Sequence, residues 1–294
     1  MRHARLVHNG QPVAGVASAD GVTIRLDTGE TVTTAQAVFL PPVQPSKIIA
    51  CHLSYKSRCV EYKMKRIPDA PSYFMKPPSS LSQHGAPVAR PRGCQFLNYE
   101  GEIGVVIGRR CSGVSVSDAL TYVRGYVPVN DWGVHDFRHA DRGSMLRVKG
   151  QDGFCPVGPF MIDAADVNPN DLLLRTYVNG LIVQEAHTGT DMLFSAAYQI
   201  ADVSRLVTLE EGDLLLTGTP ANSRPVNIGD VVEVEISGIG RLTNTVIELN
   251  RDLLTVGDGP MVSANTLHVA LAMPEDEAER FISESRREKV PKSA

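Results

Sequence analysis

One strand-like stretch decides how this chain folds: NYEGEIGVVIG, residues 98–108. Side chains alternate between the two faces of a β-strand, and every second position here is apolar: Ile103, Val105 and Ile107. Glu100 and Glu102 share the other face, so two carboxylates point the same way. The ordinary interpretation of such a pair is a solvated face, since Glu233 and Glu235 repeat the spacing elsewhere. Two further features of the chain favour a binding site.

These two features are a pair of glycines and a third carboxylate. Gly101 and Gly104 leave room beside the strand for a ligand or for another backbone. Asp131 follows a second strand-like stretch, residues 125–129. Three carboxylates with no cysteine and no obvious histidine partner suit a hard cation such as Mg²⁺, which prefers oxygen ligands and keeps coordination sites for water or substrate. The pattern therefore predicts a cation site at Glu100, Glu102 and Asp131.

Composition favours a globular protein that binds small molecules. The chain has 294 residues, enough for two domains, and 43% of them are hydrophobic. Its net charge is −4, from 29 basic and 33 acidic residues, so no basic field favours a nucleic acid or an anionic membrane as partner. Apolar runs such as Leu214–Leu216 fall far short of the ~20 residues that span a bilayer, and residues 1–10 lack a signal-peptide pattern. We therefore expect a cytoplasmic protein without a membrane partner.

Turn and proline signals divide the chain into three parts. Residues 1–45 alternate short apolar stretches with Asn-Gly and Asp-Gly pairs, which predicts a small N-terminal β domain made of hairpins. Prolines at positions 41, 42 and 45 mark its boundary with the main domain, residues 46–272. From Pro274 on, glutamate and arginine crowd the chain. Residues 273–294 are therefore expected to form a charged tail, a solvated helix that frays towards Ala294.

Strands dominate the main domain, and two helices are predicted between them. Ser117 would cap a helix over residues 118–124, which Gly125 would end, and Thr190 one over residues 191–201. Gly-Asp pairs at 212–213 and 229–230 each start an apolar strand. The proline-rich residues 72–92 are expected to be an extended loop region. The five cysteines, an odd number without a C-x-x-C pair, are interpreted as buried or incidental thiols.

Two other stretches are candidates for chemistry. HDFRH, residues 135–139, places two histidines four apart as zinc proteases do, but Asp136 stands where the base would be glutamate. We interpret residues 138–142 as a solvated loop because glycines bracket them and their charges are mixed. TGTP, residues 217–220, follows an apolar run and could present Thr219 to an anionic group, with an ordinary tight turn as the alternative. No G-x-G-x-x-G or P-loop pattern occurs, which disfavours a nucleotide cofactor.

Four motifs in this order resemble the successive signatures of the fumarylacetoacetate hydrolase superfamily: YEGE (99–102), VND (129–131), KGQDGFCPVGP (149–159) and LTGTPAN (216–222). Two supporting stretches match as well: VNG (178–180) and DMLFS (191–195). The resemblance runs from about residue 47 to 250. It implies a β-rich α+β fold, a mixed β-roll around the active site, with residues 46–272 as the catalytic domain and residues 1–45 as the small β domain often found there. It also implies a homodimer.

The resemblance further implies roles for the matching positions. Glu100, Glu102 and Asp131 would hold Mg²⁺ or Mn²⁺, while Lys149 would meet the oxyanion of the substrate and Thr219 its carboxylate. A cation chelated by a 2-oxo or 2-hydroxy acid acts as a Lewis acid that stabilises the enolate formed when a neighbouring C–C or C–H bond breaks. The residues expected to bind this small-molecule substrate are the following: Tyr55, Arg58, His135, Gln151 and Thr219.

Two departures from the family pattern bear on the reaction. Family hydrolases usually read N-Y-x-x-H-x-x-E, in which the histidine and glutamate activate the attacking water, whereas this chain reads SYKSRCVE at residues 54–61. Arg58 thus replaces the histidine, and a guanidinium has a pKa above ~12 and no acceptor lone pair, so it cannot act as a general base. It could bind a carboxylate of a di- or tricarboxylic substrate. The second departure is His135, where arginine is usual; it is a candidate for an alternative base.

KGQD (149–152) and TGTPANSRPV (217–226) look most like the isomerase/decarboxylase branch, which acts on ring-opened products of homoprotocatechuate breakdown. We therefore expect a metal-dependent enzyme that isomerises 5-carboxymethyl-2-hydroxymuconate-type dienols or decarboxylates 5-oxopent-3-ene-1,2,5-tricarboxylate. Neither reaction needs a water nucleophile, but both need a proton shuttle, for which Glu61 is the first candidate. One alternative is a C–C hydrolase of an acylpyruvate, with His52 or His135 as base. The other is a non-catalytic relative whose metal only orders the fold.

Overall fold

The stretch NYEGEIGVVIG forms the centre of the fold. The computed structural model describes residues 1–250, 257 and 259–288. Here β11 (Gly101–Ile107) pairs antiparallel with β12 (Val123–Asn130) and with β18 (Leu214–Leu216). Every residue of β11 is buried because hydrophobic side chains cover both faces of the sheet. The predicted apolar face enters a single hydrophobic cluster: Ile103, Val105 and Ile107. The predicted strand and its face are therefore confirmed.

One large sheet extends outward from β11 in both directions. Its other strands are β1 (Arg2–His8), β2 (Gln11–Ala17), β3 (Thr23–Leu26), β4 (Thr31–Thr33), β5 (Val38–Leu40), β6 (Ile48–His52), β7 (Ser72–Lys76), β8 (Leu81–Gln83), β14 (Cys155–Val157) and β15 (Met161–Asp163). In space they follow the order β4-β3-β2-β1-β15-β12-β11-β18-β6-β7; β5 pairs with β1, and β14 pairs with β12 and β8. β18 pairs with β11 on one side and, in parallel, with β6 on the other. Strands from both halves of the chain therefore lie side by side next to the centre of the sheet.

A second sheet packs against β11 and β12. Its strands, in spatial order, are β17 (Leu181–His187), β16 (Leu173–Val178), β19 (Val231–Ile236), β20 (Gly240–Glu248) and β9 (Val88–Arg90). The predicted alternation on β19 is confirmed, since Val232, Val234 and Ile236 are buried. A short pair, β10 (Leu97–Asn98) and β13 (Gly133–Val134), lies beside the start of β11. This mixed, strand-rich architecture confirms the predicted β-rich α+β class.

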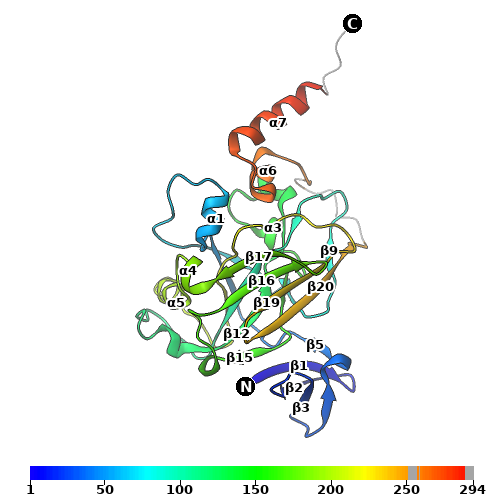
Figure 1. The fold of residues 1–294 in the computed structure, drawn as a ribbon, viewed down its shortest axis with the longest axis vertical. Coiled ribbons are helices and arrows are strands. Elements are labelled where there is room, and N and C mark those ends of the chain that lie inside the picture. Colours follow the sequence, from blue (N-terminus) through cyan, green and yellow to red (C-terminus); the bar gives the residue numbers. More distant parts are fainter. Residues whose placement is uncertain (251–256, 258, 289–294) are drawn as a thin grey trace.

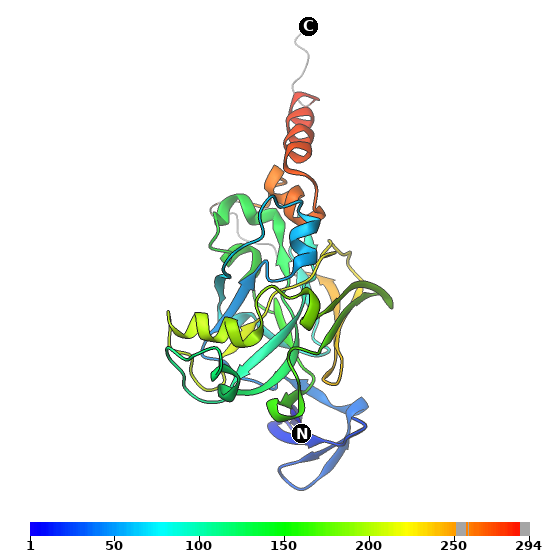
Figure 2. The same ribbon diagram turned by 60° about the vertical axis from the view of Figure 1, so that its left-hand side comes forward.

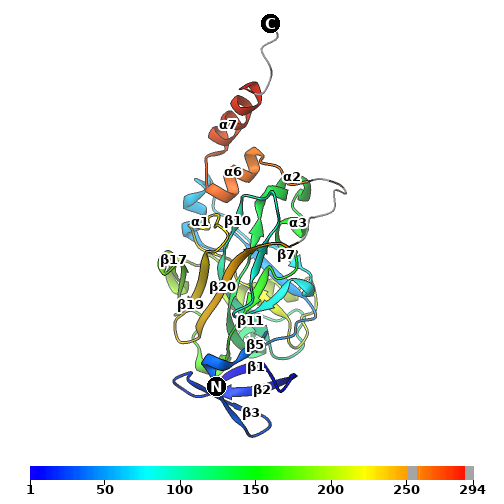
Figure 3. The same ribbon diagram turned by 90° about the vertical axis from the view of Figure 1, so that its right-hand side faces the viewer.

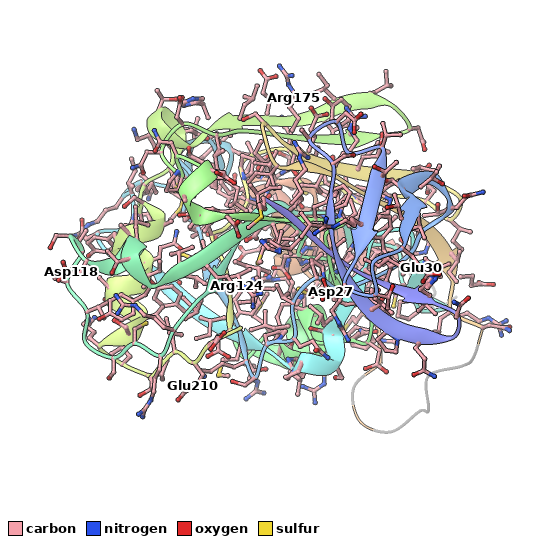
Figure 4. The ribbon with its side chains drawn as sticks, turned by 90° about the horizontal axis from the view of Figure 1, so that it is seen from below. Asp27, Glu30, Asp118, Arg124, Arg175 and Glu210 are labelled. Carbon is pink, nitrogen blue, oxygen red and sulfur yellow. The ribbon has the colours of Figure 1, made fainter. Side chains whose placement is uncertain are left out.

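The first 40 residues form the predicted hairpins. Asn9 and Gly10 both adopt positive φ, 49° and 76°, which is the conformation that a two-residue hairpin turn needs. Figure 1 shows these strands at one end of the molecule, and Figure 4 looks onto that end, where Asp27 and Glu30 are exposed. β1 also pairs with β15 and so continues the main sheet. The boundary near residue 45 stays a prediction.

Both helix predictions need correction. Residues 119–122 form only a single 3₁₀ turn, and β12 begins at Val123. The predicted stop, Gly125, lies within that strand, where a Cβ atom would meet the carbonyl oxygen of Ile162 at 2.3 Å. The second helix starts later than predicted, at Ala196, because Ser195 rather than Thr190 caps it by accepting a hydrogen bond from the Tyr198 amide.

The helices of the described part are short. They are α1 (Lys56–Glu61), α2 (Arg138–Asp141), α3 (Leu146–Lys149), α4 (Thr188–Asp191), α5 (Ala196–Ser204), α6 (Ala264–Leu271) and α7 (Glu275–Glu288). Turns of 3₁₀ helix are η1 (Thr34–Gln36), η2 (Pro78–Ser80), η3 (Ala119–Tyr122), η4 (His135–Phe137) and η5 (Ala164–Asp166). None of the helices in these residues is long and apolar enough to cross a membrane. The five cysteines are free and buried, as expected.

Residues 72–92 also differ from the prediction of an extended loop. They contain the short strands β7, β8 and β9, which pair with β6, β14 and β20 respectively. The prolines at positions 77, 78 and 87 lie between these strands, where a missing amide hydrogen breaks no ladder hydrogen bond. Partners distant in sequence therefore supply the pairing that the local pattern does not indicate.

The C-terminal segment returns to the end of the molecule opposite the N-terminal strands. Figure 1 shows α6 beside α1 at that end, and Figures 2 and 3 show α7 projecting beyond it. Ser263 and Thr266 form a capping box that starts α6. The predicted helix of the charged tail is found as α7, while its predicted fraying concerns residues 289–294, outside the described residues.

Gly101 provides a test of the packing between the two sheets. A Cβ atom at this position would lie 2.1 Å from the buried Thr176 hydroxyl, so side chains of the second sheet fill the space that the sequence suggested for a ligand. We expect Gly101→Ala to lower the free energy of unfolding by about 1–3 kcal/mol through overpacking. Gly259→Ala is the control because no atom of the described residues lies within 4 Å of its Cβ position. Equal urea midpoints for both variants would contradict this packing.

Candidate active site

A cavity of about 890 Å³ opens at the end of the molecule that carries α1, α3 and α6 (Figure 1). Its inner part holds the three carboxylates Glu100, Glu102 and Asp131 together with Lys149. Arg58 from α1 and side chains from α6 line it further out. The cavity therefore joins strands from the centre of the main sheet to segments far away in the sequence.

The pairing of β11 with β12 brings the three carboxylates together. Gly101 lies opposite Asn130, so Glu100 and Asp131 adjoin at the same end of the two strands. The Asp131 amide donates to the Glu100 carbonyl at 2.8 Å, and the Glu100 amide donates to the Asn130 side chain at 2.8 Å. One carboxylate oxygen from each of the three residues lies within 4.8 Å of the others. The predicted convergence of these residues is therefore what the structure shows.

The pKa values of Glu102 and Asp131 shift in opposite directions. Burial first, and then the neighbouring charges of Asp131 and Glu100, raise the pKa of Glu102 well above its usual range. Burial acts in the same direction on Asp131, but Lys149 and Lys76 outweigh it and lower the pKa of Asp131. Glu102 also accepts a hydrogen bond from the Gly218 amide at 2.6 Å. The charges of Asp131 and Glu100, together with burial, therefore make the ionised form of Glu102 unfavourable.

Two lysines contact the trio from opposite sides. The Lys149 ammonium lies 2.5 Å from Glu100 Oε2 and 2.9 Å from Asp131 Oδ2. The Lys76 ammonium lies 2.5 Å from Asp131 Oδ1 and also donates to the Phe154 carbonyl at 3.1 Å. The sequence analysis did not find Lys76. One signal for its burial existed, because Lys76 lies two positions after Phe74 and so on the same face of the strand. Exposed lysines at strand ends show the same pattern, so this signal does not identify a buried lysine.

Two glycines permit this close packing. A Cβ at Gly133 would lie 2.9 Å from Lys149 Cε, so only glycine leaves space for the lysine stem. Gly218 has φ of +94°, and a Cβ there would meet the Ser54 hydroxyl oxygen at 2.6 Å. Its amide can therefore reach Glu102, and the following residue, Thr219, lines the cavity.

The three carboxylates fit a divalent cation. Their oxygen atoms are hard ligands, as Mg²⁺ and Mn²⁺ prefer, and they are buried and close enough together to share one ion. A cation would also offset the mutual repulsion that raises the pKa of Glu102. Glu100, Glu102 and Asp131 would hold it. Among the described residues this trio is the one cluster of three or more such side chains, so His135 and His139 do not form a zinc site.

Arg58 is buried on α1 between two carboxylates. Its guanidinium donates to Glu61 at 2.8 Å, lies 3.4 Å from Glu100, and covers the ring of Tyr62 at 4.5 Å. The helix is placed by Asp191, which accepts hydrogen bonds from the amide and hydroxyl of Ser57 in the first turn. These contacts hold the Arg58 side chain in the wall of the cavity.

Glu61 does not line the cavity. One of its oxygens accepts from Arg58, while the other pairs with Arg224 at 2.6 Å and accepts from the Asn222 amide at 3.0 Å. Both carboxylate oxygens are therefore occupied by protein donors. A carboxylate with its lone pairs engaged in this way is a poor acceptor for a substrate proton.

Two histidines in the cavity wall have free lone pairs. His135 is 1% exposed, and neither of its ring nitrogens has a hydrogen-bond partner in the described residues. Burial first, and then the charges of Arg138, Lys149 and Arg58, lower the pKa of His135 well below its usual range. Burial also lowers the pKa of His52, whose Nε2 lacks a partner. These surroundings therefore favour the neutral form of both imidazoles, in which one ring nitrogen carries a lone pair.

Residues 138–142 are not the solvated loop that the sequence predicts. Residues 138–141 form α2, in which Asp141 is buried, and the preceding residues His135, Asp136 and Phe137 are buried as well. Asp136 accepts hydrogen bonds from the amides of Gln95 and Phe96, which anchors the segment. The mixed charges were misleading because several of them have partners inside the protein.

Of the remaining expected substrate residues, only Thr219 lines the cavity. Its hydroxyl accepts a hydrogen bond from the Gln184 side chain at 3.0 Å. Tyr55 is fully buried directly before α1, outside the cavity wall. Gln151 donates to the Arg147 carbonyl at 2.8 Å on the exposed side of α3. The structure thus brings Arg58, His135 and Thr219 together with the carboxylates, but not Tyr55, Gln151 or Glu61.

The C-terminal segment contributes a wall that no sequence signal indicated. Asn265, His268 and Val269 of α6 line the cavity, as do Pro274 and the start of α7. The Thr266 hydroxyl donates to the His135 carbonyl at 3.2 Å, and the Tyr62 hydroxyl donates to the Val269 carbonyl at 3.2 Å. These contacts attach α6 to both sides of the cavity.

Comparison with known proteins agrees with this geometry. The family model described as fumarylacetoacetate (FAA) hydrolase C-terminal matches residues 47–247. A bifunctional isomerase/decarboxylase of 4-hydroxyphenylacetate degradation from Escherichia coli is 36% identical over 217 residues, which are 74% of this chain and 50% of that enzyme. This chain therefore spans about half the length of that relative.

Two solved structures share the fold. The 5-carboxymethyl-2-hydroxymuconate delta-isomerase of Mycobacterium smegmatis superimposes with a TM-score of 0.77 at 32% identity, over 85% of this chain and 100% of that one. The maleylpyruvate hydrolase of Sphingobium sp. SYK-6, solved with manganese(II) and pyruvate, superimposes with a TM-score of 0.72 at 28% identity, over 84% and 99% of the two chains.

Metal binding can be measured directly. We expect the protein to bind Mn²⁺ in calorimetric titrations. Glu102→Gln should lower the affinity for Mn²⁺ by more than the ~10–100-fold typical of losing an outer-sphere partner. Glu235→Gln is the matched control, since Glu235 belongs to a pair with the same spacing on β19 of the second sheet, where it contacts Arg241. Lys149→Met should tighten binding because it removes a positive charge beside two ligands. Unchanged affinity in Glu102→Gln would contradict the site.

Proposed function

Because the chain belongs to the fumarylacetoacetate hydrolase family, we propose that it is a divalent-cation-dependent isomerase or decarboxylase. Its substrates would be 2-hydroxydienoic acids or 2-oxo di- and tricarboxylic acids from aromatic (homoprotocatechuate) catabolism. The observation that carries the proposal is Arg58, a cation beside Glu100 in the cavity wall. At this position family hydrolases place the histidine that activates water, and a guanidinium has no lone pair for that task.

Each charged group in the cavity suits this chemistry. When bound, the divalent cation supplies Lewis-acid stabilisation of negative charge on the substrate. Lys149 places a fixed positive charge at the same point, held by two of the three carboxylates. Preorganised charge of this kind lowers the barrier most where charge develops in the transition state. Thr219 and Arg58 would bind substrate carboxylates from the walls.

The reaction also needs a group that moves a proton between substrate atoms. Glu61 was the first candidate, but protein donors occupy both of its oxygens. His135 lines the cavity with two unpartnered ring nitrogens and a lowered pKa. We therefore favour His135 as the proton carrier and assign to Glu61 the positioning of Arg58. In isomerisation the imidazole would take a proton from one substrate atom and return it to another, so that no atom is gained or lost.

A second candidate function is the hydrolysis of an acylpyruvate. The same neutral His135 or His52 could activate a water molecule, and the Sphingobium relative is named a maleylpyruvate hydrolase. The third possibility, a non-catalytic relative, is disfavoured by the intact trio with Lys149. A homodimer and a cytoplasmic location complete the proposal, from the family resemblance and the composition.

Product analysis separates these functions. With Mn²⁺ or Mg²⁺ we expect the protein to isomerise 2-hydroxydienoates or release CO₂ from 2-oxo tricarboxylates faster than it cleaves acylpyruvates, as measured by ultraviolet absorbance and product chromatography. Arg58→His should raise acylpyruvate cleavage because it introduces a side chain with a lone pair where hydrolases carry one. Faster cleavage of acylpyruvates by the wild-type protein would support the hydrolase instead. No turnover of any of these acids would support the non-catalytic relative.

Two substitutions distinguish the candidate proton carriers. His135→Asn should lower kcat by on the order of 10²–10⁴-fold, as expected for loss of a general acid–base group, with little change in KM. Glu61→Gln should mainly raise KM, because it loosens Arg58. Exchange of substrate hydrogen with deuterated solvent provides an independent measurement and should stop only in His135→Asn. The reverse pattern would identify Glu61 as the proton carrier.

A further inference from the structure

The cavity contains one arginine whose charge has no acidic partner. Lys149 and Arg58 each contact two carboxylates, whereas no carboxylate of the described residues lies within 4.0 Å of the Arg138 guanidinium. Arg138 is half-buried at the start of α2 and lines the cavity. An arginine that is shielded from water without a counter-charge is unfavourable unless an anion is to be bound there.

The contacts of Arg138 leave one edge of its guanidinium available. Nε donates to the Asn265 side-chain oxygen at 2.9 Å, and Nη1 lies 3.8 Å from the sulfur of Met145. Nη2 has no acceptor in the described part of the chain. Terminal guanidinium nitrogens can bind both oxygens of a carboxylate, which fixes the position of the carboxylate as well as attracting it.

The surrounding charges also favour an anion at this place. Burial lowers the pKa of Arg138 and Arg58 acts in the same direction, while Tyr62, Glu100 and Asp141 act against them. Six basic and five acidic side chains line the whole cavity, and the divalent cation would increase the positive excess. The cavity therefore suits a ligand with more than one negative charge.

Asn265 belongs to α6, which the structure attaches firmly to the cavity. Beyond the contacts to His135 and Tyr62, the Asn98 side chain donates to the Ala270 carbonyl at 3.0 Å at the other end of the helix. α6 begins at residue 264, after residue 247 where the match to the family model ends. The residue that holds Arg138 therefore comes from outside the residues that the family model matches.

We propose that Arg138, positioned by Asn265, binds a second carboxylate of the substrate and that α6 thereby makes the cavity selective for di- and tricarboxylic acids. The first carboxylate would lie with the 2-oxo group at the cation site, near Lys149 and Thr219. This inference rests on the proposed function, because it assumes that a 2-oxo acid occupies that site. Arg138 is then a substrate-binding residue, and Asn265 a positioning residue that acts through it.

Binding of two small acids to the Mn²⁺-loaded protein tests the inference without turnover. Calorimetry would compare pyruvate, which has one carboxylate, with 2-oxoglutarate, which has two. The wild-type protein should bind 2-oxoglutarate more tightly. Arg138→Gln should lower the affinity for 2-oxoglutarate about 10–100-fold, the loss expected for one charged hydrogen-bonded contact. The affinity for pyruvate should stay unchanged. Retained pyruvate binding also shows that the variant is folded.

Further variants separate positioning from general stability. Arg142→Gln removes an exposed arginine four residues away and should change neither affinity. Asn265→Asp places a carboxylate against Arg138 and should reduce the preference for 2-oxoglutarate, whereas Asn265→Gln should retain part of it. A change confined to the ratio of the two affinities indicates that Asn265 positions Arg138, since a destabilised fold would lower the affinity for both acids.

The outcomes distinguish this inference from the proposed function. If the wild-type protein binds both acids but Arg138→Gln keeps the full preference for 2-oxoglutarate, the role of Arg138 is wrong while the proposed function stands. If the wild-type protein prefers pyruvate, the second carboxylate site is likewise excluded. If neither acid binds to the Mn²⁺-loaded wild-type protein, the proposed function fails, and the inference fails with it.

Discussion

The repulsion among three buried carboxylates is the constraint on which the rest of the site depends. Glu100, Glu102 and Asp131 lie together because β11 pairs with β12 in one register, and their burial makes the accumulated negative charge unfavourable. Lys149 and Lys76 offset part of this charge, and a divalent cation would offset the rest. Glycine is needed at positions 133 and 218 for the same reason. A side chain at 133 would displace Lys149, and one at 218 would displace the amide that contacts Glu102.

Two arginines in the cavity wall differ in what surrounds them, and this difference connects the fold to the substrate. Arg58 is held by Glu61 and Glu100, so part of its charge is compensated before any ligand arrives. Within the described residues Arg138 donates only to the neutral side chains of Asn265 and Met145 and keeps its charge for a ligand. A cavity with a cation site at one place and an uncompensated arginine at another can select a substrate by the distance between its two carboxylates. This is a basis for selectivity among acids of similar size.

The sequence predictions failed where partners distant in the chain override a local pattern. Residues 118–124 are flanked by a candidate cap, Ser117, and a glycine stop, Gly125, yet Val123 and the residues after it form β12 because β11 and β15 pair with them. Residues 72–92 read as a loop because prolines interrupt every periodic stretch, yet three strands form there against β6, β14 and β20. Residues 138–142 read as solvated because their charges are mixed, but residues 138–141 form α2, and the buried Asp141 accepts hydrogen bonds from the amides of Arg147 and Val148.

The sequence by itself determined the central strand, its two faces, the three carboxylates and the family, because alternation along a strand and the order of motifs are properties of the chain alone. It did not determine which other side chains complete the site. Lys76 reaches Asp131 across 55 positions, and Asn265 reaches Arg138 across 127, so neither pair has a local signature. Whether His135, Glu61 and Arg138 are free or engaged was decided only by the tertiary structure, since a side chain's lone pairs and charge depend on the neighbours that folding brings within hydrogen-bond distance.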